Sequence, residues 1–472
     1  MVPAPTTMQP NRDEGQVRLG DRRQARKGTK GSAPKLLKNM VLWAPGWEVP
    51  PRYTRMKFWE AGAGIVRILW VKAGKLLPVD TGGKIRSYNI LRHLARRHEV
   101  RFLSYYGGQR DTDYEAQIQI QLPGAETIYT AAPDASDTQR SLDYLKKLFH
   151  SAPFAVSKFT DHRVRRSVID WLSGDRCDVA VCDFLSASLN FPDHAAVPAV
   201  LFQHNVESSL WQRMAGTESH WLRRPVYKIE AGKMRRYEIS TLGRFRHVLA
   251  VSDHDRQQML EMDPACEISV VPTGVDTEKY KPAPPSSAAP PVVVFTGSMD
   301  WEPNIDAMEY FCAEIWPQVL AAAPGARFQI VGRDPHPRVK KLSSASVEVT
   351  GTVPSVEEYL RKATVVVVPL RIGGGTRLKI FEAMAMSKAM VSTTIGAEGL
   401  DVCPERDILF ADEAASFSES IVRLIREDSL RHQVERAAAE QARRYDWSRI
   451  AEQFADVLAS VMRSSPGTVV PA

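Results

Sequence analysis

The chain has 472 residues, of which 44% are hydrophobic and 25% charged, a composition typical of globular proteins. A chain of this length exceeds the usual size of one hydrophobic core, so we expect two domains. The formal net charge is +7, but residues 1–40 contain nine Lys and Arg against three Asp and Glu, which leaves only +1 for the remainder. A nucleic-acid-binding domain would carry its own basic surface, so we expect no nucleic acid partner.

Residues 1–64 are predicted to form a disordered basic tail and an irregular extension, because they lack hydrophobic periodicity. No stretch of 18 apolar residues and no apolar signal-peptide core occurs, which predicts a cytoplasmic protein. The five cysteines follow no Cys-x-x-Cys or His spacing, so we expect free thiols and no zinc site: Cys177, Cys182, Cys266, Cys312 and Cys403.

Residues 65–280 alternate short apolar runs with helical patterns, which predicts a domain with a parallel sheet covered on both faces. The expected strands are Val66–Val71, Val100–Tyr106, Asp178–Phe184, Ala199–His204, His247–Ser252 and Ile268–Pro272. Helices are expected at Lys84–Arg97, Asp161–Leu172 and Val226–Thr241, and Gly82 and Gly83 form a turn before the first of them.

The expected helix Lys84–Arg97 has an apolar residue at every third position, which gives it one buried stripe: Ile85, Tyr88, Leu91 and Leu94. Its basic residues are expected on the solvent side: Lys84, Arg86, Arg92, Arg96 and Arg97.

A Pro- and Ser-rich linker follows at residues 281–291, since this composition suits neither helix nor strand interiors. The alternating pattern then restarts, which predicts a second doubly wound domain over residues 292–444. Its expected strands are Val292–Thr296, Phe328–Val331, Val347–Thr350, Thr364–Pro369, Met390–Thr393 and Ile408–Phe410. Residues 445–472 are expected to form a C-terminal helix that packs back on the first domain.

A glycine-rich turn lies between the apolar run Val365–Val368 and a helical segment of this second domain. Backbone without a Cβ can approach a phosphate closely, and a helix N-terminus presents free N–H groups. The pattern therefore predicts an anion site in which cationic side chains contact the phosphates and a carboxylate accepts from ribose hydroxyls. Its members are Gly373, Gly374, Gly375, Thr376, Arg377, Lys379 and Glu382.

Taken together, the two α/β domains, the segment Pro272–Asp276 and the glycine loop running to Glu382-Ala383-Met384 resemble the GT-B fold. More narrowly, residues Arg67–Met462 resemble the family 4 retaining glycosyltransferases, and most of all the sugar transferases of bacterial exopolysaccharide clusters. The resemblance implies two Rossmann-like domains facing a cleft, a nucleotide-sugar donor, a glycan or lipid-linked acceptor, and retention at the anomeric carbon.

The resemblance also implies roles for individual residues. Glu382 matches the glutamate that holds the ribose, and Gly82 and Gly83 match a glycine pair that faces the donor phosphate or the acceptor. His204 matches the active-site histidine, and Gly297 opens the loop after the first strand of the nucleotide-binding domain. Catalytic roles are expected for His204, Lys379 and Arg377.

Two positions depart from the family pattern. Gly374 stands where many members have a glutamate eight residues before Glu382, and the loop Gly297–Asn304 lacks their basic residues. We interpret the departures as one coupled change, in which Arg377 and Lys379 supply the missing charge.

Breaking the bond to the sugar leaves a charged diphosphate, which N–H dipoles and fixed cations can stabilise without a metal or other cofactor. No Asp-x-Asp cluster lies at a strand end, so no metal is expected. Two alternatives stay open: a GT-B sugar-nucleotide epimerase, and a catalytically silent relative that acts as a partner protein.

An anionic membrane surface is a further expected partner, which would place the protein peripherally on the cytoplasmic membrane. The helix Lys84–Arg97 and the basic, aromatic segment Trp221–Tyr237 both belong to the first domain. Each basic residue near an anionic leaflet contributes about 1 kcal/mol, so two such segments would give reversible binding.

Overall fold

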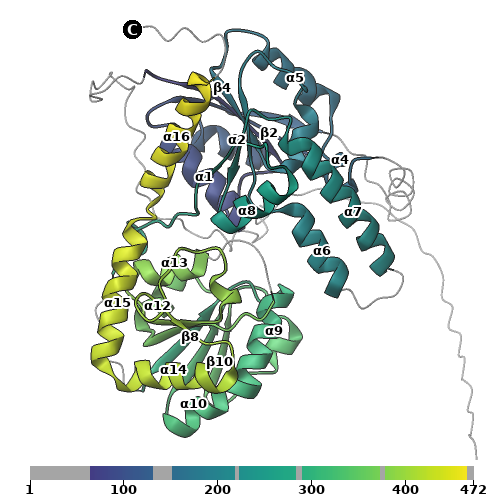
Figure 1. Ribbon diagram of the computed structural model, residues 1–472. Helices are drawn as coiled ribbons and strands as arrows, with labels where there is room; N and C mark the ends of the chain where they lie inside the picture. Colours follow the sequence, from purple (N-terminus) through teal and green to yellow (C-terminus); the bar gives the residue numbers. More distant parts are fainter. Residues whose placement is uncertain (1–63, 131–150, 218–222, 283–289, 373–377, 465–472) are drawn as a thin grey trace, which may run out of the picture. The chain divides into compact units, whose positions relative to one another are not determined.

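The computed structural model describes residues 64–130, 151–217, 223–282, 290–372 and 378–464. These residues form two parallel sheets, one of seven strands in the order β3-β2-β1-β4-β5-β6-β7 and one of six in the order β10-β9-β8-β11-β12-β13 (Figure 1). All strand pairs in both sheets are parallel. In each sheet the strand order reverses beside the first strand, which is the doubly wound arrangement in which ligands bind at the carboxyl edge.

The N-terminal domain contains the seven-stranded sheet. Its strands are β1 (Arg67–Ala73), β2 (Glu99–Tyr106), β3 (Glu126–Tyr129), β4 (Val179–Asp183), β5 (Ala199–Phe202), β6 (His247–Ala250) and β7 (Ile268–Val270). Its helices are α1 (Gly82–Leu94), α2 (Thr112–Gln121), α4 (Phe154–Ser157), α5 (His162–Leu172), the 3-10 helix η1 (Leu185–Asn190), α6 (Glu207–Thr217), α7 (Arg223–Leu242) and α8 (Asp253–Met262).

The C-terminal helix α16 (Trp447–Arg463) packs on this N-terminal domain, where it lies beside α1 (Figure 1). Phe454 of α16 stacks on Trp70 of β1 at a ring-centroid distance of 5.3 Å and meets Phe202 of β5 edge-on at 5.1 Å. All three side chains are buried, so the last helix of the chain completes the core of the first domain.

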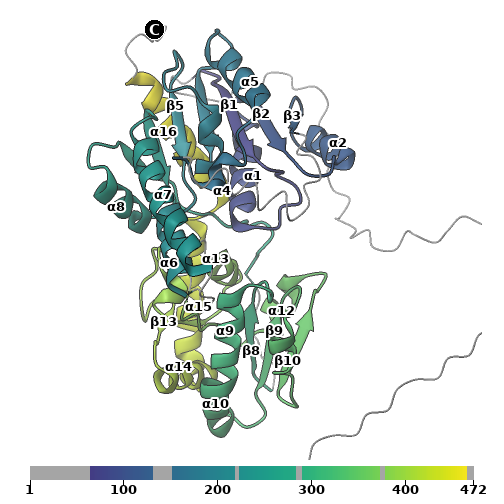
Figure 2. The same ribbon diagram turned by 90° about the vertical axis from the view of Figure 1, so that its right-hand side faces the viewer.

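The C-terminal domain contains the six-stranded sheet, whose strands β8, β9 and β10 lie side by side (Figure 2). Its strands are β8 (Val292–Thr296), β9 (Arg327–Val331), β10 (Val347–Gly351), β11 (Val365–Val368), β12 (Met390–Ser392) and β13 (Leu409–Phe410). Its helices are α9 (Glu302–Tyr310), the π-helix η2 (Phe311–Ile315), α10 (Trp316–Ala322), α11 (Pro337–Lys340), α12 (Val356–Lys362), α13 (Leu378–Ala385), η3 (Ile395–Ala397), α14 (Ala414–Arg426) and α15 (Asp428–Arg443).

The predicted fold class is confirmed, because both halves are doubly wound parallel α/β domains. Strand β3 was not predicted from the sequence. It is a short edge strand with no fully buried residue, so it lacks the continuous apolar run that marks the central strands.

The prediction for the basic face of α1 was wrong at Arg86, which is 1% exposed. The buried face of this helix includes Arg86, Ser87, Ile90, Leu91 and Leu94, so it is rotated from the expected stripe. Arg86 can be buried because its guanidinium is hydrogen-bonded to protein groups. Two other basic residues of this segment form ion pairs, Lys84 with Asp80 and Arg97 with Glu452 of α16.

Candidate functional site

A buried cluster of charged side chains lies at the carboxyl ends of β1, β4 and β5. Lys72 of β1 donates to Asp183 Oδ2 at 2.9 Å, and the Trp70 indole N–H donates to the same oxygen at 3.0 Å. His204, two residues after β5, contacts Asp183 Oδ1 through Nε2 at 2.7 Å. Lys72, Asp183 and His204 are each no more than 3% exposed, so water cannot replace these contacts.

The hydrogen bonds of His204 define its protonation state. Arg86, which can only donate, contacts Nδ1 at 2.7 Å, so Nδ1 accepts and Nε2 carries the proton that is donated to Asp183. Burial lowers the pKa of His204 to about 3, against the opposing effect of Asp183, so the ring is neutral at pH 7. Although burial alone would raise the pKa of Asp183, Lys72 and His204 hold it below its usual range.

Phe184 packs against the imidazole and explains why Gly83 lacks a side chain. The Phe184 ring stacks on His204 with centroids 3.7 Å apart and planes 4° apart, and its backbone has a φ of 72°. A Cβ on Gly83 would lie 2.3 Å from the tip of that ring. Gly82 and Gly83 are the first two residues of α1, whereas they were predicted to form a turn before it, and their N–H groups have no partner within the helix.

Arg86 connects this cluster to the segment Thr273–Asp276. Its Nε and Nη2 both donate to Thr273 Oγ1, at 3.1 and 2.5 Å. Burial lowers the pKa of Arg86 to about 10, so the guanidinium stays charged at neutral pH. Gly274 follows, and a Cβ there would lie 2.6 Å from the Trp447 ring at the start of α16.

A pocket of about 440 Å³ opens beside these residues. Its lining includes Arg86, His204 and Thr273. Polar side chains from the starts of α6 and α8 and the turns before them also line it, namely Asn205, Ser209, Ser252 and Asp255, as do residues 381, 398–401 and 445. The described part of the lining does not include Gly297, Lys379 or Glu382. The predicted site residues therefore form two groups. One is in the N-terminal domain, where His204 lines the pocket and Gly82 and Gly83 begin α1, and the other is on the C-terminal domain.

The second group lies at the carboxyl edge of the six-stranded sheet. Lys379, the second residue of α13, donates to Asn304 Oδ1 at 3.2 Å, and its Nζ lies 4.1 Å from the centroid of the Phe295 ring. A Cβ on Gly297 would lie 3.0 Å from Lys379 Nζ and 2.8 Å from Asn304 Nδ2. The absence of a side chain at position 297 therefore leaves room for the ammonium group at the end of β8.

Glu382 lies one turn further along α13 and is half-buried. Its Oε1 accepts a hydrogen bond of 3.0 Å from the Tyr280 hydroxyl. Burial raises the pKa of the Glu382 carboxyl, while the Tyr280 hydrogen bond and the charges of Lys279 and Lys379 oppose this rise.

The predicted loop residues Gly373, Gly374, Gly375, Thr376 and Arg377 lie outside the described residues. The sequence analysis also missed several residues that complete the two groups: Lys72, Asp183, Phe184, Thr273, Tyr280 and Asn304. One signal was available for Lys72, because a lysine inside an apolar strand requires a buried partner.

Two family models match this chain, each over one domain. Residues 81–279 match "Glycosyltransferase Family 4" and residues 290–427 match "Glycosyl transferases group 1". A structure of Anabaena HepE in complex with UDP and glucose shares the fold, with a TM-score of 0.54 and 12% identity over 84% of this chain and 100% of that one. Two doubly wound parallel domains of this kind define the GT-B class of proteins. The chain belongs to the family 4, or group 1, glycosyltransferases.

Two curated relatives are similar in sequence. The chain is 27% identical over 249 residues to a phosphatidyl-myo-inositol mannosyltransferase of Mycobacterium leprae, which is 49% of this chain and 63% of that protein. It is 24% identical over 139 residues to an uncharacterized 44.6 kDa protein in the cps region of Klebsiella pneumoniae, which is 28% of this chain and 36% of that protein. The chain thus spans less than two thirds of the length of either relative. No helix in its described residues has the length and hydropathy needed to cross a membrane.

Proposed function

We propose that the protein is a retaining glycosyltransferase that moves a sugar from a nucleotide-sugar donor to a glycan or lipid-linked acceptor in polysaccharide biosynthesis. The observation that carries this proposal is the arrangement of Gly297, Lys379 and Glu382 at the carboxyl edge of the C-terminal sheet. Doubly wound sheets bind nucleotides at that edge, where a cation suits the diphosphate and a carboxylate suits ribose hydroxyls. The UDP complex of HepE and the name of the mannosyltransferase relative support the substrate classes, and the relative in the Klebsiella cps region supports a role in polysaccharide biosynthesis.

His204 fits a positioning role in this proposal, since both of its ring nitrogens are hydrogen-bonded to protein groups. The imidazole and Thr273 together fix the Arg86 guanidinium in the lining of the pocket. That pocket suits the sugar or the acceptor, because polar side chains and charged groups of both signs line it. Lys379 and Arg377 remain the proposed contacts to the leaving diphosphate.

The donor site predicts a specific effect of Glu382→Gln. The substitution keeps the size of the side chain but replaces a carboxylate oxygen with an NH₂ group that cannot accept from ribose. We expect an increase of about 10–100-fold in the KM for the donor, as a hydrogen bond to a charged group contributes about 1.5–3 kcal/mol. The measurement is donor turnover with UDP-, GDP- and ADP-sugars, after a thermal-shift screen has identified the nucleotide that binds.

Glu358→Gln is a matched control for that experiment, since Glu358 is an exposed carboxylate in the first turn of α12. It should leave the donor KM unchanged. A normal donor KM in Glu382→Gln would refute the ribose role of Glu382, and no binding of any nucleotide sugar by the parent protein would refute the proposed function.

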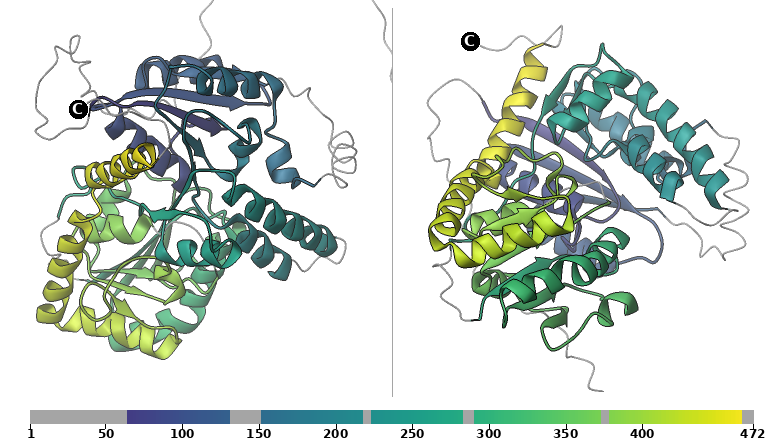
Figure 3. Two further views of the ribbon diagram at one scale, coloured as in Figure 1. Left: turned by 45° about the horizontal axis from the view of Figure 1, so that its top comes forward. Right: turned by 60° about the horizontal axis from the view of Figure 1, so that its bottom comes forward.

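A lipid-linked acceptor would require the protein to approach a membrane, and α7 offers a suitable surface. Helices α6 and α7 lie side by side (Figure 3). The exposed face of α7 contains two apolar and four basic residues, whereas the acidic residues Glu230 and Glu238 of this helix are buried. These apolar and basic residues are Val226, Ile229, Arg224, Lys228, Arg235 and Arg236, and Pro225 and Ser240 are exposed as well. This combination is typical of helices that bind anionic lipid surfaces.

We expect the protein to cosediment with anionic vesicles and to dissociate as the salt concentration rises. The variant Lys228→Ala/Arg235→Ala/Arg236→Ala should bind anionic vesicles less tightly, with a binding free energy less favourable by about 3 kcal/mol, at about 1 kcal/mol per basic residue. The control Arg327→Ala/Lys340→Ala/Lys341→Ala removes three exposed basic residues of the C-terminal domain and should bind as the parent does. Equal binding to neutral vesicles, or equal loss in both triple variants, would contradict the role of α7.

A further inference from the structure

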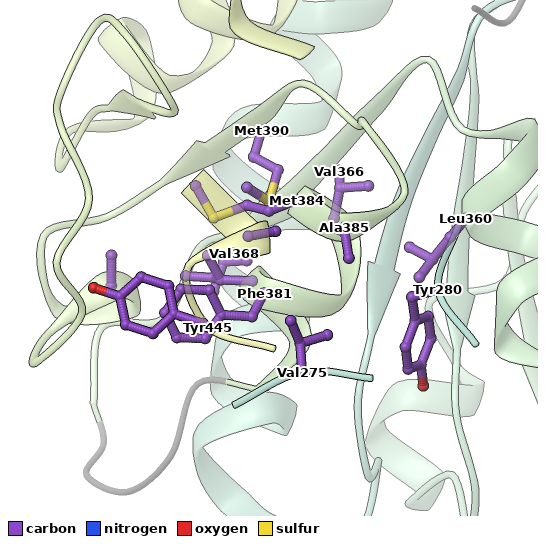
Figure 4. Packing of buried hydrophobic residues seen from close by; sticks show 14 of the residues in the cluster. Val275, Tyr280, Leu360, Val366, Val368, Phe381, Met384, Ala385, Met390 and Tyr445 are labelled. Atoms are coloured by element: carbon purple, nitrogen blue, oxygen red, sulfur yellow. The ribbon is translucent and has the colours of Figure 1, made fainter. Parts of the chain in front are cut away.

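Tyr280 lies at the end of the segment that leads out of the N-terminal domain, and its side chain contacts the C-terminal domain. The ring is 9% exposed and belongs to the same hydrophobic cluster as Leu360 of α12, beside which it lies in Figure 4. Its hydroxyl points out of that cluster and donates to Glu382 Oε1 at 3.0 Å. The neighbouring Lys279 pairs with Glu357 of α12 at 2.9 Å, which attaches the segment to the helix at a second point.

The Tyr280 hydroxyl makes polar contacts that the apolar packing of the ring does not need: it donates to Glu382 and accepts from Lys279 Nζ at 3.4 Å. A phenylalanine would fill the same space against Leu360, so packing alone does not account for a tyrosine at this position. The hydroxyl acts on one oxygen of Glu382, which fixes the plane of the carboxyl group and leaves Oε2 for another donor. A hydrogen bond to a carboxylate favours its charged form, whereas burial and the nearby Glu357 favour the neutral form.

We propose that Tyr280 is a positioning residue for nucleoside diphosphate binding, because its hydroxyl holds the Glu382 carboxylate in the orientation that accepts from the ribose. This inference rests on the proposed function, in which Glu382 contacts the ribose. It extends the donor site to the segment Thr273–Tyr280, whose Thr273 also receives the Arg86 guanidinium at the pocket. One short segment therefore contacts both groups of proposed site residues.

The test is Tyr280→Phe, which removes the hydroxyl and keeps the ring. We expect the Kd of the nucleoside diphosphate to rise about tenfold in isothermal titration with UDP, GDP or ADP, whichever binds the parent most tightly. The kcat at saturating donor should change less than twofold, because the hydroxyl does not contact the reacting atoms. In a Glu382→Ala background, Tyr280→Phe should have no further effect on the Kd, since its only route to the ribose is then absent.

Tyr114→Phe is the matched control, as it removes a buried hydroxyl that is hydrogen-bonded to Ser104 in the N-terminal domain. It should leave the nucleotide Kd unchanged. An unchanged Kd in Tyr280→Phe, or an equal rise with and without Glu382, would overturn the positioning role while leaving the donor site intact. An unchanged Kd in Glu382→Ala alone would instead remove the ribose contact of the proposed function, and the role of Tyr280 with it.

Discussion

Replacing Asp183 with alanine is expected to lower the free energy of unfolding by about 3–5 kcal/mol, because it leaves a buried cation without its counter-charge. Asp183 is fully buried and accepts from three donors, the Lys72 ammonium, the Trp70 indole and His204. Lys72 also donates to the Ser87 hydroxyl at 3.2 Å and lies 4.5 Å from the centroid of the Phe184 ring, but neither group can neutralise its charge. The loss should therefore be far larger than that of an ordinary surface substitution.

Urea denaturation at pH 8 measures this effect without interference from histidine protonation. The pKa of His204 is about 3 in the folded protein, below its ordinary value of about 6.5. Between these values the unfolded state binds more protons, so stability is complete above pH 6.5 and falls as the pH decreases. The depressed pKa of Asp183 acts in the same direction, but only below its ordinary value of about 3.9.

Asp175→Ala serves as the control, because the Asp175 side chain is 96% exposed and pairs with Arg67 at the surface. Its effect should be at most about 1 kcal/mol. The double variant Lys72→Met/Asp183→Ala should recover part of the loss, since it removes the charge that Asp183→Ala leaves unpaired. Equal stabilities of Asp183→Ala and Asp175→Ala would show that the buried charges contribute nothing to the fold.

The fold could be predicted from the sequence because its central strands are buried on both faces. Runs such as Val365–Val368 have four fully buried residues, and helical patterns separate them at regular spacing. The edge strand β3 lacks that signal, since none of its residues is fully buried. Arg86 was misplaced for a related reason. Hydrophobic periodicity assigns charged residues to solvent, and it cannot anticipate a buried guanidinium that contacts residues 118 and 187 positions away.

Candidate site residues could be predicted from the sequence only where they lie close together in one segment of the chain. Lys379 and Glu382 were proposed because they follow a glycine loop on one helix, and Gly297 because it opens the loop after the first strand of the domain. Their partners Asn304 and Tyr280 lie 75 and 102 residues away in sequence, and no short motif connects them. The parallel sheet brings Asn304 and Lys379 together at its carboxyl edge, and the packing of Tyr280 beside α12 brings its hydroxyl to Glu382. The topology therefore had to be known before the contacts could be identified.

Replacing Lys379 with alanine is expected to lower kcat/KM for the nucleotide-sugar donor by about 10²–10³-fold. Negative charge develops on the diphosphate as the bond to the sugar breaks, and removal of one preorganised charge-stabilising group typically reduces the rate by about this factor. The ammonium is held beside Gly297 by Asn304 and the Phe295 ring, so it occupies its position before the donor arrives. Because charge is greater in the transition state than in the bound donor, kcat should fall more than KM rises.

Lys379→Arg tests whether the positive charge alone is sufficient for activity or whether the ammonium geometry is also needed. The substitution keeps the charge, but the larger guanidinium must fit beside Asn304 and Gly297. We expect this variant to retain less than a tenth of the parent activity. Lys340→Ala is the matched control, as Lys340 is an exposed lysine of the same domain and should retain full activity. Steady-state kinetics with the preferred donor, together with the nucleoside diphosphate Kd, separate an effect on donor binding from an effect on the chemical step. If Lys379→Ala weakens the Kd and lowers kcat/KM by the same factor with kcat unchanged, Lys379 holds the donor in its ground state, and the leaving diphosphate must be stabilised by other groups.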